Sequence, residues 1–136
     1  MKTTKLLFAI MFVLTSATVI GQSQKQLERE KNKVDILTVE ERANLQLFFY
    51  DKTKAMNLSE DTEEAYYRYF FHYVYDMQRL NDKDQDYNKE DMKKEFRKLV
   101  TKMDARMAPI LTDEQFKMYK ENWNAIMKVV HFKNGR

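Results

Sequence analysis

Chain breakers are almost absent from this sequence, and this constrains the fold more than any other feature. The 136 residues contain two glycines and one proline, whereas β-sandwiches and α/β domains need many tight turns, which favour those residue types. Apolar residues recur instead at the three- and four-residue spacings of a helix face. One clean example is the series Met92, Phe96, Leu99, Val100 and Met103. The sequence therefore predicts an all-α protein.

The first 21 residues have the three-part layout of a secretory signal peptide. Lys2 and Lys5 give a positive start, residues 6–14 are apolar, and residues 15–21 are rich in small side chains. The apolar run is shorter than the roughly 20 residues of a membrane-spanning helix, so we expect a cleaved leader and no stable membrane anchor. Cleavage fits best after Gly21, with cleavage after Ala17 as the alternative. The mature protein is then expected to be periplasmic or secreted.

Loss of the leader changes the charge balance. The whole chain has 24 basic and 21 acidic residues, but Lys2 and Lys5 leave with the leader, so the mature chain has 22 against 21. A net charge of +1 gives little attraction for a polyanion, and we therefore expect no nucleic-acid partner. The chain has no cysteine, which excludes disulfides and a lipid-modified N-terminal cysteine.

The mature sequence divides into a charged lead-in over residues 22–36 and a single helical domain over residues 37–136. Capping residues mark four expected helix starts, because their side-chain oxygens accept from N–H groups of the first turn. We expect helices over residues 38–56, 59–80, 88–109 and from 112 onward, capped by Thr38, Ser59, Asn88 and Thr112. Short connections favour antiparallel neighbours, in hairpins or a small bundle.

The helix expected over residues 59–80 carries more aromatic surface than one packing face buries. Beside its main apolar stripe runs a second stripe of Tyr67, Phe71 and Tyr75. Three such side chains approach the largest apolar patch that a monomer ordinarily exposes. We therefore expect Tyr67, Phe71 and Tyr75 to be covered, either by another helix or a second copy of the chain, or by transient protein partners.

The loop after this helix contains the one arrangement that resembles an ion site. Its oxygen donors occupy positions 1, 3, 5 and 12 of an EF-hand loop, and they are Asp84, Asp86, Asn88 and Glu95. Lys89 stands where the sharp turn needs glycine. The favoured interpretation is a solvated loop whose Asn88 caps a helix, without a resident metal, and ion binding by residues 84–95 is the alternative.

Catalytic arrangements are not recognisable in the sequence. The mature chain has no cysteine, and His72 and His131 lie in separate expected helices, so no nucleophile and base are paired by spacing. No glycine-rich loop is present to cradle a phosphate. We expect no enzymatic activity and no cofactor.

Two similar five-residue boxes stand at expected helix starts. In each, the threonine hydroxyl accepts from a backbone N–H of the first turn, and the Glu or Gln three residues later accepts from the threonine N–H. The full Leu-Thr-x-x-Gln pattern is present in Leu111, Thr112 and Gln115, and a near copy with Glu in the last position is formed by Leu37, Thr38 and Glu41.

An exported, cysteine-free helical chain with these boxes resembles the Spy/CpxP-type LTxxQ family of bacterial periplasmic proteins, and its leader resembles those of Bacteroidetes members. The resemblance covers roughly residues 36–130. It implies a small α-helical protein that forms a cradle-shaped homodimer and acts as an ATP-independent chaperone or envelope-stress adaptor. We accordingly expect binding of unfolded or stress-related proteins through the aromatic helix. Ion binding by the 84–95 loop and a purely structural or assembly dimer are the alternatives.

Overall fold

A computed structural model describes residues 24–35 and 37–134, with their side chains through Lys128. The predicted leader lies outside the described residues. The described chain is helical and contains no strand, which confirms the predicted all-α class. No helix in this part of the chain is long and apolar enough to cross a membrane.

The chain divides into two units, residues 1–32 and residues 33–136. The described part of the first unit is helix α2, Gln24–Asn32. Its charged and amide side chains are exposed except for the half-buried Asn32, and its one apolar residue, Leu27, is 45% exposed. These residues fall in the predicted lead-in.

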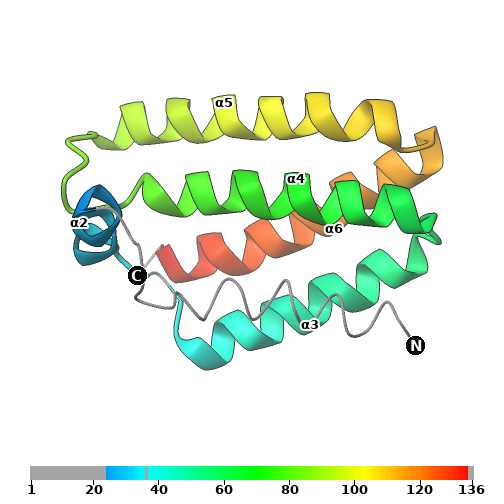
Figure 1. Ribbon diagram of the computed structural model, residues 1–136, viewed down its shortest axis with the longest axis horizontal. Coiled ribbons are helices and arrows are strands. Elements are labelled where there is room, and N and C mark those ends of the chain that lie inside the picture. The colour runs from blue at the N-terminus through cyan, green and yellow to red at the C-terminus, as the bar shows by residue number, and fades with distance from the viewer. Residues whose placement is uncertain (1–23, 36, 135–136) are drawn as a thin grey trace. The chain divides into compact units, whose positions relative to one another are not determined.

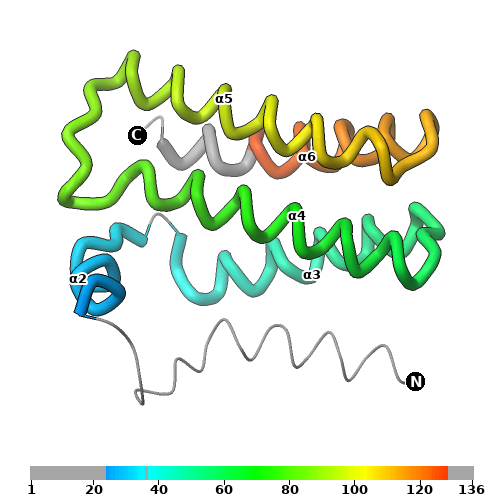
Figure 2. Tube along the Cα trace, turned by 45° about the horizontal axis from the view of Figure 1, so that its top comes forward, coloured from blue at the N-terminus to red at the C-terminus, as the bar shows by residue number. Residues whose placement is uncertain are grey.

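The second unit contains the four predicted main helices. They are α3 (Val39–Ala55), α4 (Glu60–Arg79), α5 (Lys89–Met107) and α6 (Asp113–Asn134), and a 3₁₀ helix, η1 (Ala108–Ile110), joins α5 to α6. Within this unit α4 lies between α3 and α5, each running antiparallel to its neighbour (Figures 1 and 2), and α6 crosses behind α4 in the view of Figure 1. The expected helix boundaries agree with these to within two residues, because the cap residues identified from the sequence occupy the cap positions.

Local chemistry explains where the helices begin and end. Ser59 and Asn88 each cap a helix through a side-chain oxygen, which accepts from Thr62 N at 3.4 Å and from Asp91 N at 2.8 Å. Helix α3 ends where Asn57 adopts a left-handed conformation, with φ of 51°. Asparagine tolerates this conformation better than most residues. The chain can therefore turn into α4 without a glycine.

An aromatic series through all four helices forms the centre of the core. Phe49 of α3 stacks on Phe70 of α4 at 3.9 Å between ring centroids, and Phe70 meets the edge of Trp123 of α6 at 6.0 Å. Trp123 in turn stacks on Phe96 of α5 at 6.4 Å. Met56, Met77, Met103 and Met107 are buried among the helices. Flexible methionines suit such irregular spaces between rings.

Candidate functional site

The second aromatic stripe of α4 is partly buried by the chain itself. Tyr67 is only 4% exposed, because its ring meets the edge of Phe49 of α3 at 5.8 Å. Phe71 also contacts Phe49, at 5.9 Å, and is half-buried, as is Tyr75. Of the covers that the sequence left open for this stripe, the structure shows another helix for Tyr67, whereas Phe71 and Tyr75 stay partly exposed.

Tyr67 and its neighbour Tyr66 place two phenol groups in the interior. Burial raises the pKa of Tyr67 to about 12, with a smaller contribution from Glu63, and burial raises the pKa of Tyr66 further. The Thr53 hydroxyl opposes both shifts in part, but it donates its own hydrogen bond to Phe49 O at 2.8 Å. Neither phenol oxygen has a well-formed hydrogen bond within the described chain. Both groups are therefore held neutral and belong to the core rather than to a binding surface.

The two Leu-Thr boxes form complete capping boxes. Thr38 N donates to Glu41 Oε2 at 2.9 Å while Glu41 N donates to Thr38 Oγ1 at 3.2 Å. The second box repeats this arrangement, with 3.0 Å from Thr112 N to Gln115 Oε1 and 3.2 Å for the reverse bond. The expected capping role of both motifs is thus present in the structure.

Gln115 does more than close its own box. Its Nε2 donates to the Met56 carbonyl at 3.3 Å, and Asn122 Nδ2 approaches Met56 Sδ at 3.9 Å. The glutamine therefore joins the start of α6 to the end of α3. Leu111 is 9% exposed and lies in the core, whereas Leu37 is half-buried. The second box is an element of tertiary packing as well as a cap.

The 84–95 loop is not assembled as an ion site. Asn88 Oδ1 accepts from Asp91 N as the cap of α5, and Glu95 Oε1 accepts from Lys98 Nζ at 2.6 Å. Lys98 also lowers the pKa of the Glu95 carboxyl. Across residues 24–35 and 37–128, no three His, Cys, Asp or Glu side chains are grouped closely enough to hold a metal ion. The loop thus provides no support for the ion-binding alternative.

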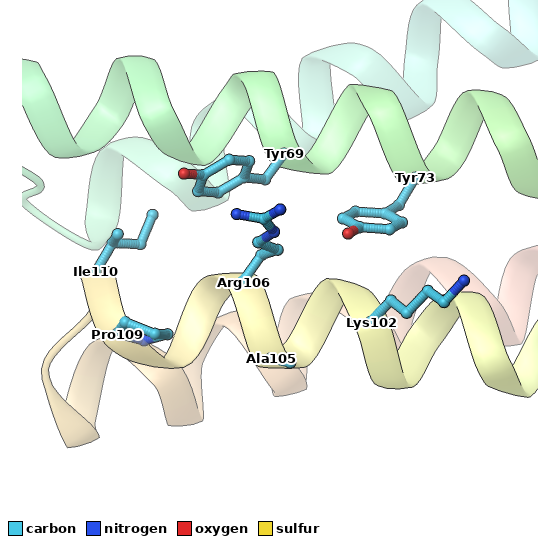
Figure 3. A pocket seen from close by; sticks show the side chains of 7 residues that line it. All are labelled: Tyr69, Tyr73, Lys102, Ala105, Arg106, Pro109 and Ile110. Carbon is cyan, nitrogen blue, oxygen red and sulfur yellow. The ribbon is translucent and has the colours of Figure 1, made fainter.

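An open groove lies between α4 and α5 in the second unit. It has a volume of about 570 Å³. We call it the α4–α5 groove, and its lining consists of Tyr69, Tyr73, Lys102, Ala105, Arg106, Pro109 and Ile110 (Figure 3). The two tyrosines come from α4 and the other residues from α5 and η1. Both tyrosines are half-buried, whereas Lys102 and Arg106 are exposed.

The charges around this groove are uneven. Its described lining has two cations and no acid. Two other cations of the bundle, Lys98 and Lys120, pair with Glu95 and Asp104, both at 2.6 Å. The α4–α5 groove therefore combines aromatic rings with two cations that form no ion pair with a described acid.

Sequence reasoning missed this groove for an identifiable reason. Tyr69 and Tyr73 belong to the main apolar stripe of α4, and nothing in the sequence singled them out from its other members. The stripe is wide enough for its flank to reach the surface beside α5. Lys102 and Arg106, four residues apart, were a usable signal, because that spacing places two cations on one side of a helix.

Searches of known family models, curated proteins and solved structures gave no match to this chain.

Proposed function

We propose that this protein is an exported, non-enzymatic binding protein that holds unfolded or stress-related polypeptides on the α4–α5 groove. The observation that carries the proposal is the composition of that groove: Tyr69 and Tyr73 offer apolar area with hydroxyl groups, and Lys102 and Arg106 add charge. Tyrosine and arginine are enriched where proteins bind one another, since they tolerate partial wetting. An open, shallow surface of this kind suits extended chains better than a small substrate, which is usually enclosed.

The capping boxes support a function similar to that of the Spy/CpxP-type LTxxQ proteins. Both boxes form the reciprocal hydrogen bonds that the motif predicts. The Gln115 amide oxygen accepts within its box, and its amide nitrogen donates to Met56 O. A glutamate could accept in the box but could not donate to Met56 O. This gives a physical reason for Gln at the end of the second motif. Export through the 1–21 leader is part of the same proposal.

Aggregation of a denatured client tests the proposal directly. Chemically denatured malate dehydrogenase is diluted into buffer with an equimolar amount of the purified protein, and right-angle light scattering is followed. We expect slower aggregation with the protein present, and weaker suppression by Tyr73→Ser. Tyr87→Ser is the matched control, because Tyr87 lies outside the groove in the loop before α5 and is 38% exposed. Circular dichroism checks that both variants remain helical.

Each result has a defined meaning. An unchanged aggregation rate with the wild-type protein would refute client holding. Equal suppression by Tyr73→Ser and the wild type would place the client surface elsewhere.

The homodimer implied by the family resemblance is measured on the same samples by light scattering after size exclusion. A dimer that Tyr73→Ser dissociates would identify self-association, and hence the structural alternative, as the use of this face.

A further inference from the structure

The two cations of the α4–α5 groove form no ion pair with a described residue, in contrast to two other cations of α5. On the same helix Lys93 pairs with Glu90 at 3.6 Å, and Lys98 pairs with Glu95. Lys102 and Arg106 make no ion pair with any residue in the described chain, although both are exposed at the groove. Two exposed cations one helical turn apart, without ion-pair partners among the described residues, favour an anionic ligand that supplies two charges at a similar spacing.

Arg106 is held in a defined position. Its guanidinium lies between the side chains of Tyr69 and Tyr73 (Figure 3), with 5.8 Å from its central carbon to the Tyr69 ring centroid. The N–H groups of a guanidinium lie in one plane, where they can donate to both oxygens of one carboxylate. The groove thus presents a planar donor that matches a carboxylate.

The groove has an apolar end and a cationic end. Pro109 and Ile110 lie at one end, Lys102 lies at the other, and Arg106 is between them (Figure 3). From residue 110 to residue 102 the helical rise is about 12 Å. An extended peptide covers that distance with about four residues. One helical turn, from residue 102 to residue 106, is also about as long as two steps of an extended peptide. Residues i and i+2 of such a peptide carry their side chains on the same side.

We infer that the α4–α5 groove binds an extended acidic segment with the pattern apolar-x-acid-x-acid. The apolar side chain packs on Pro109 and Ile110, the first carboxylate meets Arg106, and the second meets Lys102. This inference rests on the proposed function and defines its ligand class: among unfolded chains, segments that combine an apolar residue with alternating acids are preferred.

Fluorescence anisotropy with a labelled peptide tests the inference. The probe contains Leu-Ser-Glu-Ser-Glu between glycines, and the comparison peptide contains Leu-Ser-Gln-Ser-Gln. We expect the acidic peptide to bind at least about tenfold more tightly, because only its carboxylates form charge-assisted hydrogen bonds. The difference is expected to shrink as salt is raised. Equal affinities for the two peptides would overturn the inference.

Paired double variants separate the groove from general attraction. Lys102→Gln with Arg106→Gln removes the groove cations, while Lys94→Gln with Arg97→Gln removes two exposed cations of α5 that lie outside its lining. We expect the first pair to weaken binding about tenfold or more and the second less than about threefold. Equal losses would overturn the inference, as would groove-dependent binding of a single-stranded oligonucleotide that is tighter than that of the acidic peptide. Circular dichroism controls for folding.

The peptide titration and the aggregation assay can fail independently. Acidic-peptide binding that requires Lys102 and Arg106, together with no suppression of aggregation, supports this ligand class and overturns the proposed function. Suppression of aggregation without peptide binding that depends on these two cations overturns the ligand class alone.

Discussion

Gln115 Nε2 donates to the Met56 carbonyl at 3.3 Å, a bond between residues 59 positions apart that ties the first turn of α6 to the end of α3. The same side chain accepts from Thr112 N. One amide therefore serves a local cap and a tertiary contact, which a carboxylate cannot do because it has no proton to donate at neutral pH.

The first prediction concerns that bond. Gln115→Glu preserves the acceptor of the capping box but removes the donor to Met56 O and places a negative charge near it. We expect the free energy of unfolding to fall by about 1–2 kcal/mol, measured by urea denaturation. Asn124→Asp is the matched control, since it makes the same amide-to-carboxylate change at an exposed position of α6. Equal effects of the two substitutions would show that charge, and not the lost hydrogen bond, is responsible.

A second prediction separates the two parts of the Tyr67 side chain. Tyr67→Phe removes a buried hydroxyl without a well-formed hydrogen bond, so stability should be unchanged or higher by up to about 1 kcal/mol. Tyr67→Ala removes a ring packed on Phe49 and should cost about 3–5 kcal/mol. Thermal unfolding measures both. Strong destabilisation by Tyr67→Phe would mean that the hydroxyl has a partner that stabilises the fold.

Much of the fold followed from local chemistry that the sequence displays. Thr38, Ser59 and Asn88 cap helices as expected, because a cap depends on residues within one turn. The aromatic excess of α4 was also visible. The sequence did not show which helix covers this aromatic surface. The cover is Phe49 of α3, which packs against Tyr67 and Phe71, and periodicity within one helix carries no information on contacts with another.

The candidate site was harder to predict than the fold. The groove requires Arg106 of α5 to lie over Tyr69 of α4, and this juxtaposition depends on how two helices are aligned along their length. The same limit applies to Gln115, whose motif predicts the bond to Thr112 but contains no information on Met56. Contacts within a turn were therefore predictable, whereas contacts between helices needed the structure.

The third prediction concerns Asp104, which links α5 and α6. Its Oδ1 accepts from Tyr119 Oη at 2.7 Å and its Oδ2 accepts from Lys120 Nζ at 2.6 Å. Tyr119→Phe removes the buried donor to a charged acceptor and should lower the free energy of unfolding by about 1.5–3 kcal/mol. Tyr87→Phe, in the exposed loop, should change it by less than about 0.5 kcal/mol. Similar values for the two variants in urea denaturation would contradict a stabilising role for the Tyr119 bond.

The last prediction is that the protein unfolds in alkali as its buried phenols ionise. Burial raises the pKa of Tyr66, Tyr67 and Tyr119 above their ordinary value of about 10, and the hydrogen bond to Asp104 adds to the shift at Tyr119. The folded state therefore keeps these protons while the unfolded chain releases them. The stabilisation is fully present below pH 10 and is lost as the pH rises further, by roughly 1.4 kcal/mol per pH unit for each tyrosine.

Absorbance at 295 nm measures phenolate, and circular dichroism at 222 nm measures helix. Three of the eight tyrosines should ionise in the same step in which helix is lost, and Tyr67→Phe should reduce that step by one tyrosine. Ionisation of all eight with the helical signal intact would show that the three phenols reach solvent in the folded protein. Because Tyr66 and Tyr67 lie between α3 and α4 and Tyr119 lies beside α5, coincidence of the two signals would also show that the four helices unfold as one unit.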